Sequence, residues 1–123
     1  MKTLIHNATI VNEGRIFVGS LLIEDDHIAS ITEGETTVCE ADAPQIIDAK
    51  GMILMPGVID THVHFRDGGQ SENPAGTFYS ESRAARAGGV TSVVDMPNTK
   101  PLTTTLEALE AKEALAARDS AVN

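Results

Sequence analysis

The sequence contains little of what several common classes of protein require. Its 123 residues include no tryptophan and a single cysteine, Cys39, and aromatic residues make up only 3% of the chain. A lone cysteine excludes an internal disulfide and fits a reducing compartment. Lys and Arg number nine against 18 Asp and Glu, so the net charge is −9. This acidic balance argues against nucleic acid or an anionic membrane as the main partner.

Long apolar runs are also absent. No run approaches the ~20 residues that a bilayer-spanning helix needs, and the first residues lack the apolar core of a secretory signal. Hydrophobic residues nevertheless make up 41% of the chain, which is enough for a globular protein with a modest core. We therefore expect a cytoplasmic protein without a membrane partner.

The most informative stretch is 56–66, which reads Pro-Gly-Val-Ile-Asp-Thr-His-Val-His-Phe-Arg. Turn residues flank it, and its alternation predicts one buried strand with Asp60, His62, His64 and Arg66 on a shared face. Histidines two positions apart in a strand lie about 6.5–7 Å apart at Cα, so both rings can reach one ion through zinc–nitrogen bonds of about 2.0–2.1 Å. The pattern favours a metal site over the alternative, which is a pair of ordinary strand histidines with hydrogen-bond partners.

The predicted elements fall into two regions with different patterns of secondary structure. Residues 1–54 read as a small β domain, a fragment of a sandwich or barrel, and residues 55–123 alternate strands with helices. The strands predicted in the first region are 4–11, 16–23, 28–31, 45–49 and 52–55. The elements predicted in the second region are a strand at 58–66, a helix at 77–87 that starts from a cap at 73–74, a strand at 90–96, a helix at 106–118 capped by Thr104, and the opening of a strand at 121–123.

Strands that alternate with helices predict parallel βα units within an α/β fold. Two such units cannot close a barrel, because an eight-unit barrel requires about 250 residues. We therefore expect the chain to be the front piece of a longer protein. By itself the piece is expected to be inactive and poorly stable, since the edge of its barrel would be open.

Four segments carry a family pattern across nearly the whole chain. They are 5–11, 47–60, 62–66 and 87–99, and the His-Val-His-Phe-Arg and Met-Pro-Asn-Thr pieces within them are the most specific. In these segments the sequence resembles the amidohydrolase superfamily and, within it, the dihydroorotases of the cyclic-amidohydrolase group. The resemblance implies that residues 1–54 form part of a composite β-sandwich. It also implies that residues 55–123 are the first two βα units of a (β/α)8 TIM barrel, whose chemistry lies at the C-terminal ends of its strands.

The resemblance further implies roles for four side chains. His62 and His64 would bind the more buried ion of a zinc site that holds one or two ions, with the remaining ligands beyond Asn123. Arg66 and Asn98 would hold the carboxylate of a small-molecule substrate, dihydroorotate or carbamoyl-aspartate. The implied enzyme is a metal-dependent hydrolase of cyclic amide C–N bonds in pyrimidine biosynthesis, and the full-length protein is expected to be a homodimer. No catalytic residue is expected within the chain itself.

One departure from the family pattern follows the arginine, where Asp-Gly-Gly at 67–69 stands in place of Glu-Pro-Gly. We expect the loss of the proline to loosen this loop. Three alternative functions stay open: an allantoinase or dihydropyrimidinase, a non-catalytic scaffold for aspartate transcarbamoylase, and a small β-rich interaction domain. Local alternatives stay open as well. Arg66 can form a surface ion pair with Asp67, and Asn98 suits a turn. Asp60 can either orient a histidine or serve as a polar residue of the barrel floor.

Overall fold

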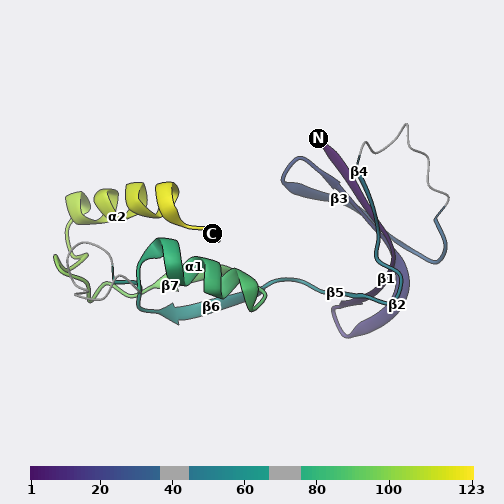
Figure 1. Cartoon of the computed structure of the whole chain (residues 1–123), viewed down its shortest axis with the longest axis horizontal. Coiled ribbons are helices and arrows are strands. Elements are labelled where there is room, and N and C mark those ends of the chain that lie inside the picture. Colours follow the sequence, from purple (N-terminus) through teal and green to yellow (C-terminus); the bar gives the residue numbers. More distant parts are fainter. Residues whose placement is uncertain (37–44, 67–75) are drawn as a thin grey trace. The chain divides into compact units, whose positions relative to one another are not determined.

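The computed structural model describes residues 1–36, 45–66 and 76–123. The chain divides into two compact units, Met1–Pro56 and Gly57–Asn123, whereas the sequence predicted the boundary between residues 54 and 55 (Figure 1). The first unit consists of strands and the second alternates strands with helices, so the chain has the predicted α/β composition. None of the described helices combines the length and the hydrophobicity that crossing a bilayer demands.

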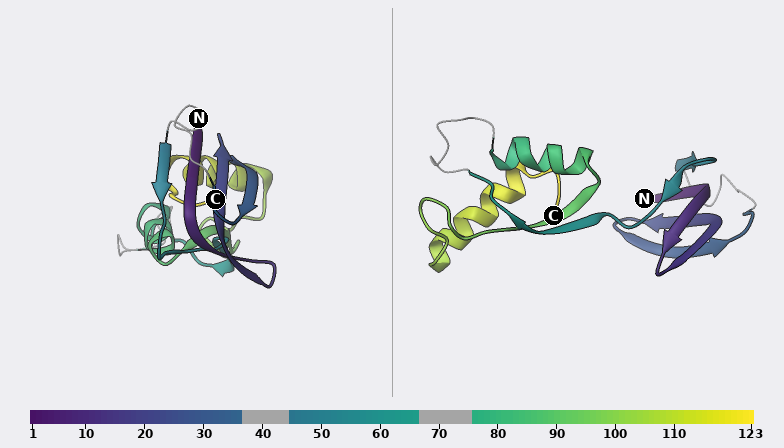
Figure 2. Two further views of the ribbon diagram at one scale, coloured as in Figure 1. Left: turned by 90° about the vertical axis from the view of Figure 1, so that its right-hand side faces the viewer. Right: turned by 90° about the horizontal axis from the view of Figure 1, so that it is seen from below.

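Within the described residues, the first unit is built on one sheet. β1 lies at its centre, where it pairs antiparallel with β2 and parallel with both β4 and β5, and β3 continues the sheet beyond β2. β1 and β2 are long and curved (Figure 2). The bounds are β1 (Lys2–Asn12), β2 (Arg15–Glu24), β3 (His27–Glu33), β4 (Gln45–Asp48) and β5 (Ile53–Leu54), so each predicted strand is present.

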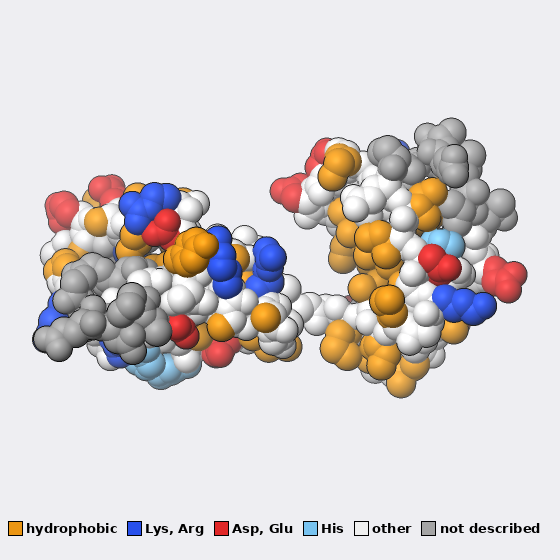
Figure 3. All heavy atoms as spheres, viewed as in Figure 1, with side chains coloured by type: hydrophobic (Ala, Val, Ile, Leu, Met, Phe, Trp, Pro, Cys, Tyr) orange, Lys and Arg blue, Asp and Glu red, His pale blue; other side chains and the backbone are white. Residues whose placement is uncertain are grey.

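The core of the first unit is small. Its main cluster consists of the buried residues Ala8, Ile10 and Ala49, and the side chains packed against them are Ile5, Phe17 and Leu54. Other apolar side chains of this unit lie at the surface, including those of Ile16, Val18 and Ile28 (Figure 3). The described residues of this unit therefore bury few large side chains.

A bulge interrupts β1 beside this core. The register with β2 shifts between Ile5 and Ala8, and Asn7 adopts a left-handed conformation with φ of 59°. Asparagine tolerates this conformation better than most residues with a Cβ atom. Asn7 Nδ2 donates to Oδ1 of Asp48 over 2.9 Å, and the Lys50 backbone N–H donates to the same oxygen over 3.1 Å. These bonds tie the bulge to the end of β4.

The hydrogen bond from Asn7, and next the one from the Lys50 backbone, lower the pKa of Asp48 below its ordinary value. A carboxyl group whose pKa is lower in the folded chain stabilises the fold above the unfolded-state pKa, and this stabilisation is lost as the pH falls through the folded-state pKa. We therefore expect the first unit to lose stability below about pH 4. Asp48→Asn should lose less stability than wild type between about pH 6 and about pH 3.

Urea unfolding followed by far-ultraviolet circular dichroism at the two pH values measures this difference. Glu35→Gln, which also removes one negative charge, is the matched control and should keep the pH dependence of the wild-type chain. Equal losses of stability in wild type and Asp48→Asn would show that the Asp48 bonds do not contribute.

The second unit contains two consecutive βα pairs. β6 and β7 are parallel neighbours, and α1 packs against β7 and α2 (Figures 1 and 2). The bounds are β6 (Val58–Val63), α1 (Phe78–Ala87), β7 (Val90–Asp95) and α2 (Leu106–Asp119). This order of parallel strands and helices is the one that the sequence predicts.

The last residues of the chain lie beside β7. The Asn123 backbone N–H donates to Thr91 O over 3.0 Å, and Val93 N–H donates to Asn123 O over 2.7 Å. In a parallel ladder, one residue makes its two backbone hydrogen bonds to residues of the neighbouring strand that lie two positions apart, as Thr91 and Val93 do. Residues 121–123 are not assigned to a strand, but Asn123 pairs with β7 as the predicted strand opening would.

Helix α1 begins one residue later than predicted and has a different cap. Its N-cap is Thr77, whose hydroxyl accepts a hydrogen bond from Ser80 N over 3.1 Å in a capping box. The cap predicted at 73–74 lies outside the described residues. The helix ends at the predicted glycines, with Gly88 as its C-cap.

Helix α2 is capped by Thr105, so the prediction of Thr104 is wrong. The Thr105 hydroxyl accepts from Ala108 N over 3.3 Å, and its backbone is extended as an N-cap requires. Three threonines stand in a row at 103–105, and each offers the same hydroxyl. The backbone conformation decides between them, and composition alone does not reveal it.

Strand β6 differs from the prediction in both length and burial. It ends at Val63, so residues 64–66 belong to the segment that follows it. Val58 is 55% exposed and Ile59 is 63% exposed. Parallel strands become buried when other layers cover both of their faces. Among the described elements β6 pairs with β7 alone. The predicted strand is therefore present, but the prediction that it is buried is wrong for this chain.

Candidate functional site

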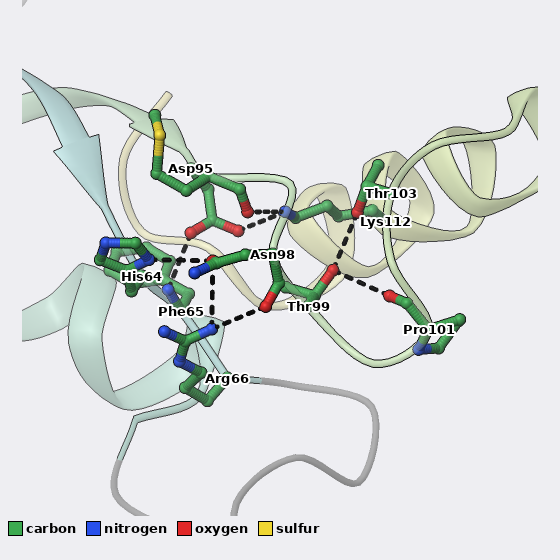
Figure 4. Close-up of polar contacts among 10 residues, drawn as sticks. His64, Phe65, Arg66, Asp95, Asn98, Thr99, Pro101, Thr103 and Lys112 are labelled. Carbon is green, nitrogen blue, oxygen red and sulfur yellow. Dashed lines mark hydrogen bonds and ion pairs between the residues drawn. The ribbon is translucent and has the colours of Figure 1, made fainter.

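The residues singled out by the sequence meet at the C-terminal ends of β6 and β7. His62 lies within β6, and His64 and Arg66 follow it. Asn98 lies in the segment after β7 (Figure 4). The Met96 backbone N–H donates to Val63 O over 3.0 Å and keeps the two segments side by side beyond the strands. The parallel pairing thus brings together side chains that are more than 30 positions apart in sequence.

The two histidine rings converge although the strand ends between them. His62 Nε2 and His64 Nε2 are 3.2 Å apart, and the ring centroids are 5.0 Å apart with an interplanar angle of 64°. Two nitrogens bound tetrahedrally to zinc at about 2.0–2.1 Å are separated by about 3.3–3.4 Å. The spacing of the pair therefore fits two ligands of one zinc ion.

Asn98 connects His64 to Arg66. His64 Nδ1 is 3.0 Å from Asn98 Oδ1. Arg66 Nη1 donates to the Asn98 carbonyl oxygen over 3.1 Å and to Oδ1 over 3.3 Å. The guanidinium, the amide and the imidazole consequently form one continuous chain of polar contacts (Figure 4).

A nearly buried ion pair between Asp95 and Lys112 holds both segments that carry the site. Asp95 Oδ1 accepts from the Phe65 backbone N–H over 2.8 Å, and Asp95 Oδ2 lies 2.5 Å from Lys112 Nζ. Lys112 Nζ also donates to Met96 O over 3.0 Å. The side chains of Asp95 and Lys112 are 8% and 15% exposed. Helix α2 thereby fixes the residue between His64 and Arg66 and the backbone just before Asn98.

The sequence analysis did not predict the ion pair between Asp95 and Lys112. One signal was available: Lys112 shares a helix face with Ala108 and Leu115, and all three are half-buried. A charged residue inside an apolar stripe requires a partner of opposite charge. The sequence does not reveal which carboxylate it reaches.

Two further titratable side chains, those of Asp60 and His27, contact groups other than the converging rings of the site. Asp60 Oδ1 accepts from the His62 backbone N–H over 3.1 Å, so it contacts the backbone and not the imidazole. His27 Nδ1 lies 2.5 Å from Asp26 Oδ1 on the exposed surface of the first unit. Residues 67–69 lie outside the described residues. Within the described ranges, no group of three or more His, Cys, Asp or Glu side chains is placed to hold a metal ion.

Known proteins are similar to the chain in both sequence and fold. It is 41% identical over 111 residues to a dihydroorotase of Pediococcus pentosaceus, and the aligned region covers 90% of this chain and 25% of that protein. It is 49% identical over 83 residues to a dihydroorotase of a Wolbachia species, and the aligned region covers 68% of this chain and 18% of that protein. The chain thus spans about a quarter, or less, of the length of these curated relatives.

The solved structure of an L-hydantoinase (dihydropyrimidinase) from Arthrobacter aurescens has the same fold over the shared region. The TM-score is 0.86 at 35% identity, and the match covers 98% of this chain and 26% of the hydantoinase. The chain has the architecture of the amino-terminal part of that fold. The model of the amidohydrolase family matches residues 53–118, which include both histidines, Arg66 and Asn98. The chain belongs to the amidohydrolase family.

Proposed function

We propose that the chain is the amino-terminal part of a zinc-dependent cyclic amidohydrolase of the dihydroorotase type. This enzyme would interconvert N-carbamoyl-aspartate and dihydroorotate in pyrimidine biosynthesis. The observation that carries the proposal is the convergence of His62 and His64 at 3.2 Å beside Arg66 and Asn98. Their position at the C-terminal ends of parallel strands is where barrel enzymes place their chemistry. The similarity to dihydroorotases supports the same reaction.

His62 and His64 would supply two ligands of the metal, and the rest of the enzyme would supply the others. When bound, the metal provides a Lewis acid for the cyclic amide carbonyl and makes water more acidic. Arg66 would bind the substrate carboxylate, because a guanidinium presents parallel donors that match the two carboxylate oxygens. Asn98 would add a neutral amide to the same subsite. These groups would fix the orientation of the ring relative to the metal.

The second candidate is a hydantoinase or dihydropyrimidinase. The structural match to the L-hydantoinase at a TM-score of 0.86 favours it. Substrates of that kind, such as dihydrouracil, do not carry the ring carboxylate of dihydroorotate. The presence of Arg66 beside the histidine pair therefore favours the first candidate.

Turnover by the complete zinc-loaded enzyme distinguishes the two candidates. We expect kcat/KM for dihydroorotate to exceed that for allantoin and dihydrouracil by about 10–100-fold, which corresponds to the ~1.5–3 kcal/mol of a hydrogen bond to a charged group. Higher turnover of dihydrouracil would favour the second candidate. A zinc-loaded enzyme that opens none of the three rings would overturn the proposed reaction class.

A further inference from the structure

We propose that Asn98 is a positioning residue for His64, in addition to any contact it makes with substrate. Its amide oxygen, oriented by Arg66, would hold the proton of neutral His64 on Nδ1 and leave Nε2 free to bind a metal ion. This inference rests on the proposed function only where it concerns the metal. The protonation of His64 follows from three contacts within the chain and can be measured without a metal.

Arg66 orients the amide of Asn98, because a guanidinium can only donate hydrogen bonds. Its Nη1 lies 3.1 Å from Asn98 O and 3.3 Å from Asn98 Oδ1. Reversing the side-chain amide of Asn98 would turn its NH2 group toward the guanidinium and oppose two donors. The guanidinium therefore selects the orientation in which the amide oxygen faces it.

The same amide oxygen faces His64. Because Oδ1 is an acceptor and lies 3.0 Å from His64 Nδ1, the ring must donate from Nδ1. A neutral imidazole carries one proton, so Nε2 then has a free lone pair. This is the nitrogen that lies 3.2 Å from His62 Nε2, on the side where the two rings converge.

The arrangement supplies what a metal-binding histidine needs from its surroundings. Ligating histidines usually donate their other N–H to a carboxylate or a carbonyl oxygen, and loss of that partner commonly reduces metal affinity by about 10–100-fold. Asn98 offers a carbonyl oxygen in this position. The orienting partner of His64 is thus a residue for which the sequence analysis considered only substrate binding or a turn.

The first test is the tautomer of His64 in the metal-free chain at about pH 9, where ordinary histidines are neutral. Two-bond 1H–15N correlations of 15N-labelled protein identify which ring nitrogen carries the proton. We expect Nδ1–H for His64 in wild type and in Asn98→Asp, which keeps an oxygen acceptor. Asn98→Leu, which keeps the shape but removes the amide, should lose this preference. Wild-type His64 protonated on Nε2 would overturn the inference without any variant.

The second test is Zn2+ affinity measured by calorimetry in the absence of substrate. We expect Asn98→Leu to bind Zn2+ about 10–100-fold more weakly than wild type and Asn98→Asp to retain wild-type affinity. In the complete enzyme, Asn98→Asp should keep its metal but raise KM, because its charge repels a substrate carboxylate. A role in substrate binding alone predicts unchanged Zn2+ affinity in Asn98→Leu, and that result would overturn the inference. A complete wild-type enzyme that binds no Zn2+ would instead overturn the proposed metal site, and the tautomer measurement would still decide the hydrogen bond.

Discussion

Replacing His64 with alanine should reduce Zn2+ affinity of the chain by more than about 100-fold, because a ligand contributes more than the 10–100-fold typical of the partner that orients it. His64 brings its Nε2 to within 3.2 Å of His62 Nε2, and its loss removes one of the two ligands that this chain would supply. His62→Ala should have the same effect. In the complete enzyme, both variants should reduce turnover to background.

Calorimetric titration of Zn2+ into the complete metal-free enzyme measures this loss. His27→Ala is the matched control, since it removes an exposed imidazole that belongs to the first unit. It should leave the affinity unchanged. Equal losses in His27→Ala and His64→Ala would mean that the ion binds at scattered surface histidines, and the two-histidine site would have to be abandoned.

Replacing Lys112 with methionine should destabilise the second unit by about 3 kcal/mol, at the lower end of the range for breaking a buried ion pair. The substitution keeps most of the apolar stem but leaves Asp95, 8% exposed, without its cation. It also removes the donor to Met96 O. The Asp95→Asn/Lys112→Met double variant should recover part of the loss, because no uncompensated charge then stays inside.

Intrinsic fluorescence follows the unfolding of the second unit selectively, because Tyr79 is the only tyrosine and the chain has no tryptophan. Arg118→Met is the control on the same helix, since its ion pair with Asp119 lies at the surface with the Arg118 side chain 69% exposed. Such pairs contribute about 0–1 kcal/mol. If Lys112→Met and Arg118→Met shift the urea midpoint equally, the Asp95–Lys112 pair does not hold the unit together.

The order of strands and helices could be predicted from the sequence, because hydrophobic periodicity and the glycines that end strands and helices are local signals. The spacing of His62 and His64 also predicted two converging rings, although for a partly wrong reason. The prediction relied on a continuous strand through Arg66, whereas β6 ends at Val63. The rings still meet because the Met96–Val63 hydrogen bond and the Asp95–Phe65 bond hold the segment beyond the strand beside β7.

The contacts that position the site could not be predicted, because they depend on tertiary distance. Lys112 reaches Asp95 only once α2 lies against the end of β7, and nothing near Lys112 in sequence specifies this partner. The orientation of Asn98 depends on an arginine 32 positions earlier. Residue types therefore indicated the chemistry of the site, and the packing of α2 and the loop after β7 determined its connections.

The short sequence distance between the two halves of the site has a consequence for biosynthesis. His64 and Asn98 are 34 positions apart, and only one helix and one strand separate them. Closing a loop of this length costs only modestly more entropy than closing a shorter one, because the cost grows with the logarithm of loop length. His62, His64 and Asn98 can therefore come together on the ribosome soon after β7 emerges. A cation that binds at that stage would stabilise the correctly paired strands of the nascent polypeptide.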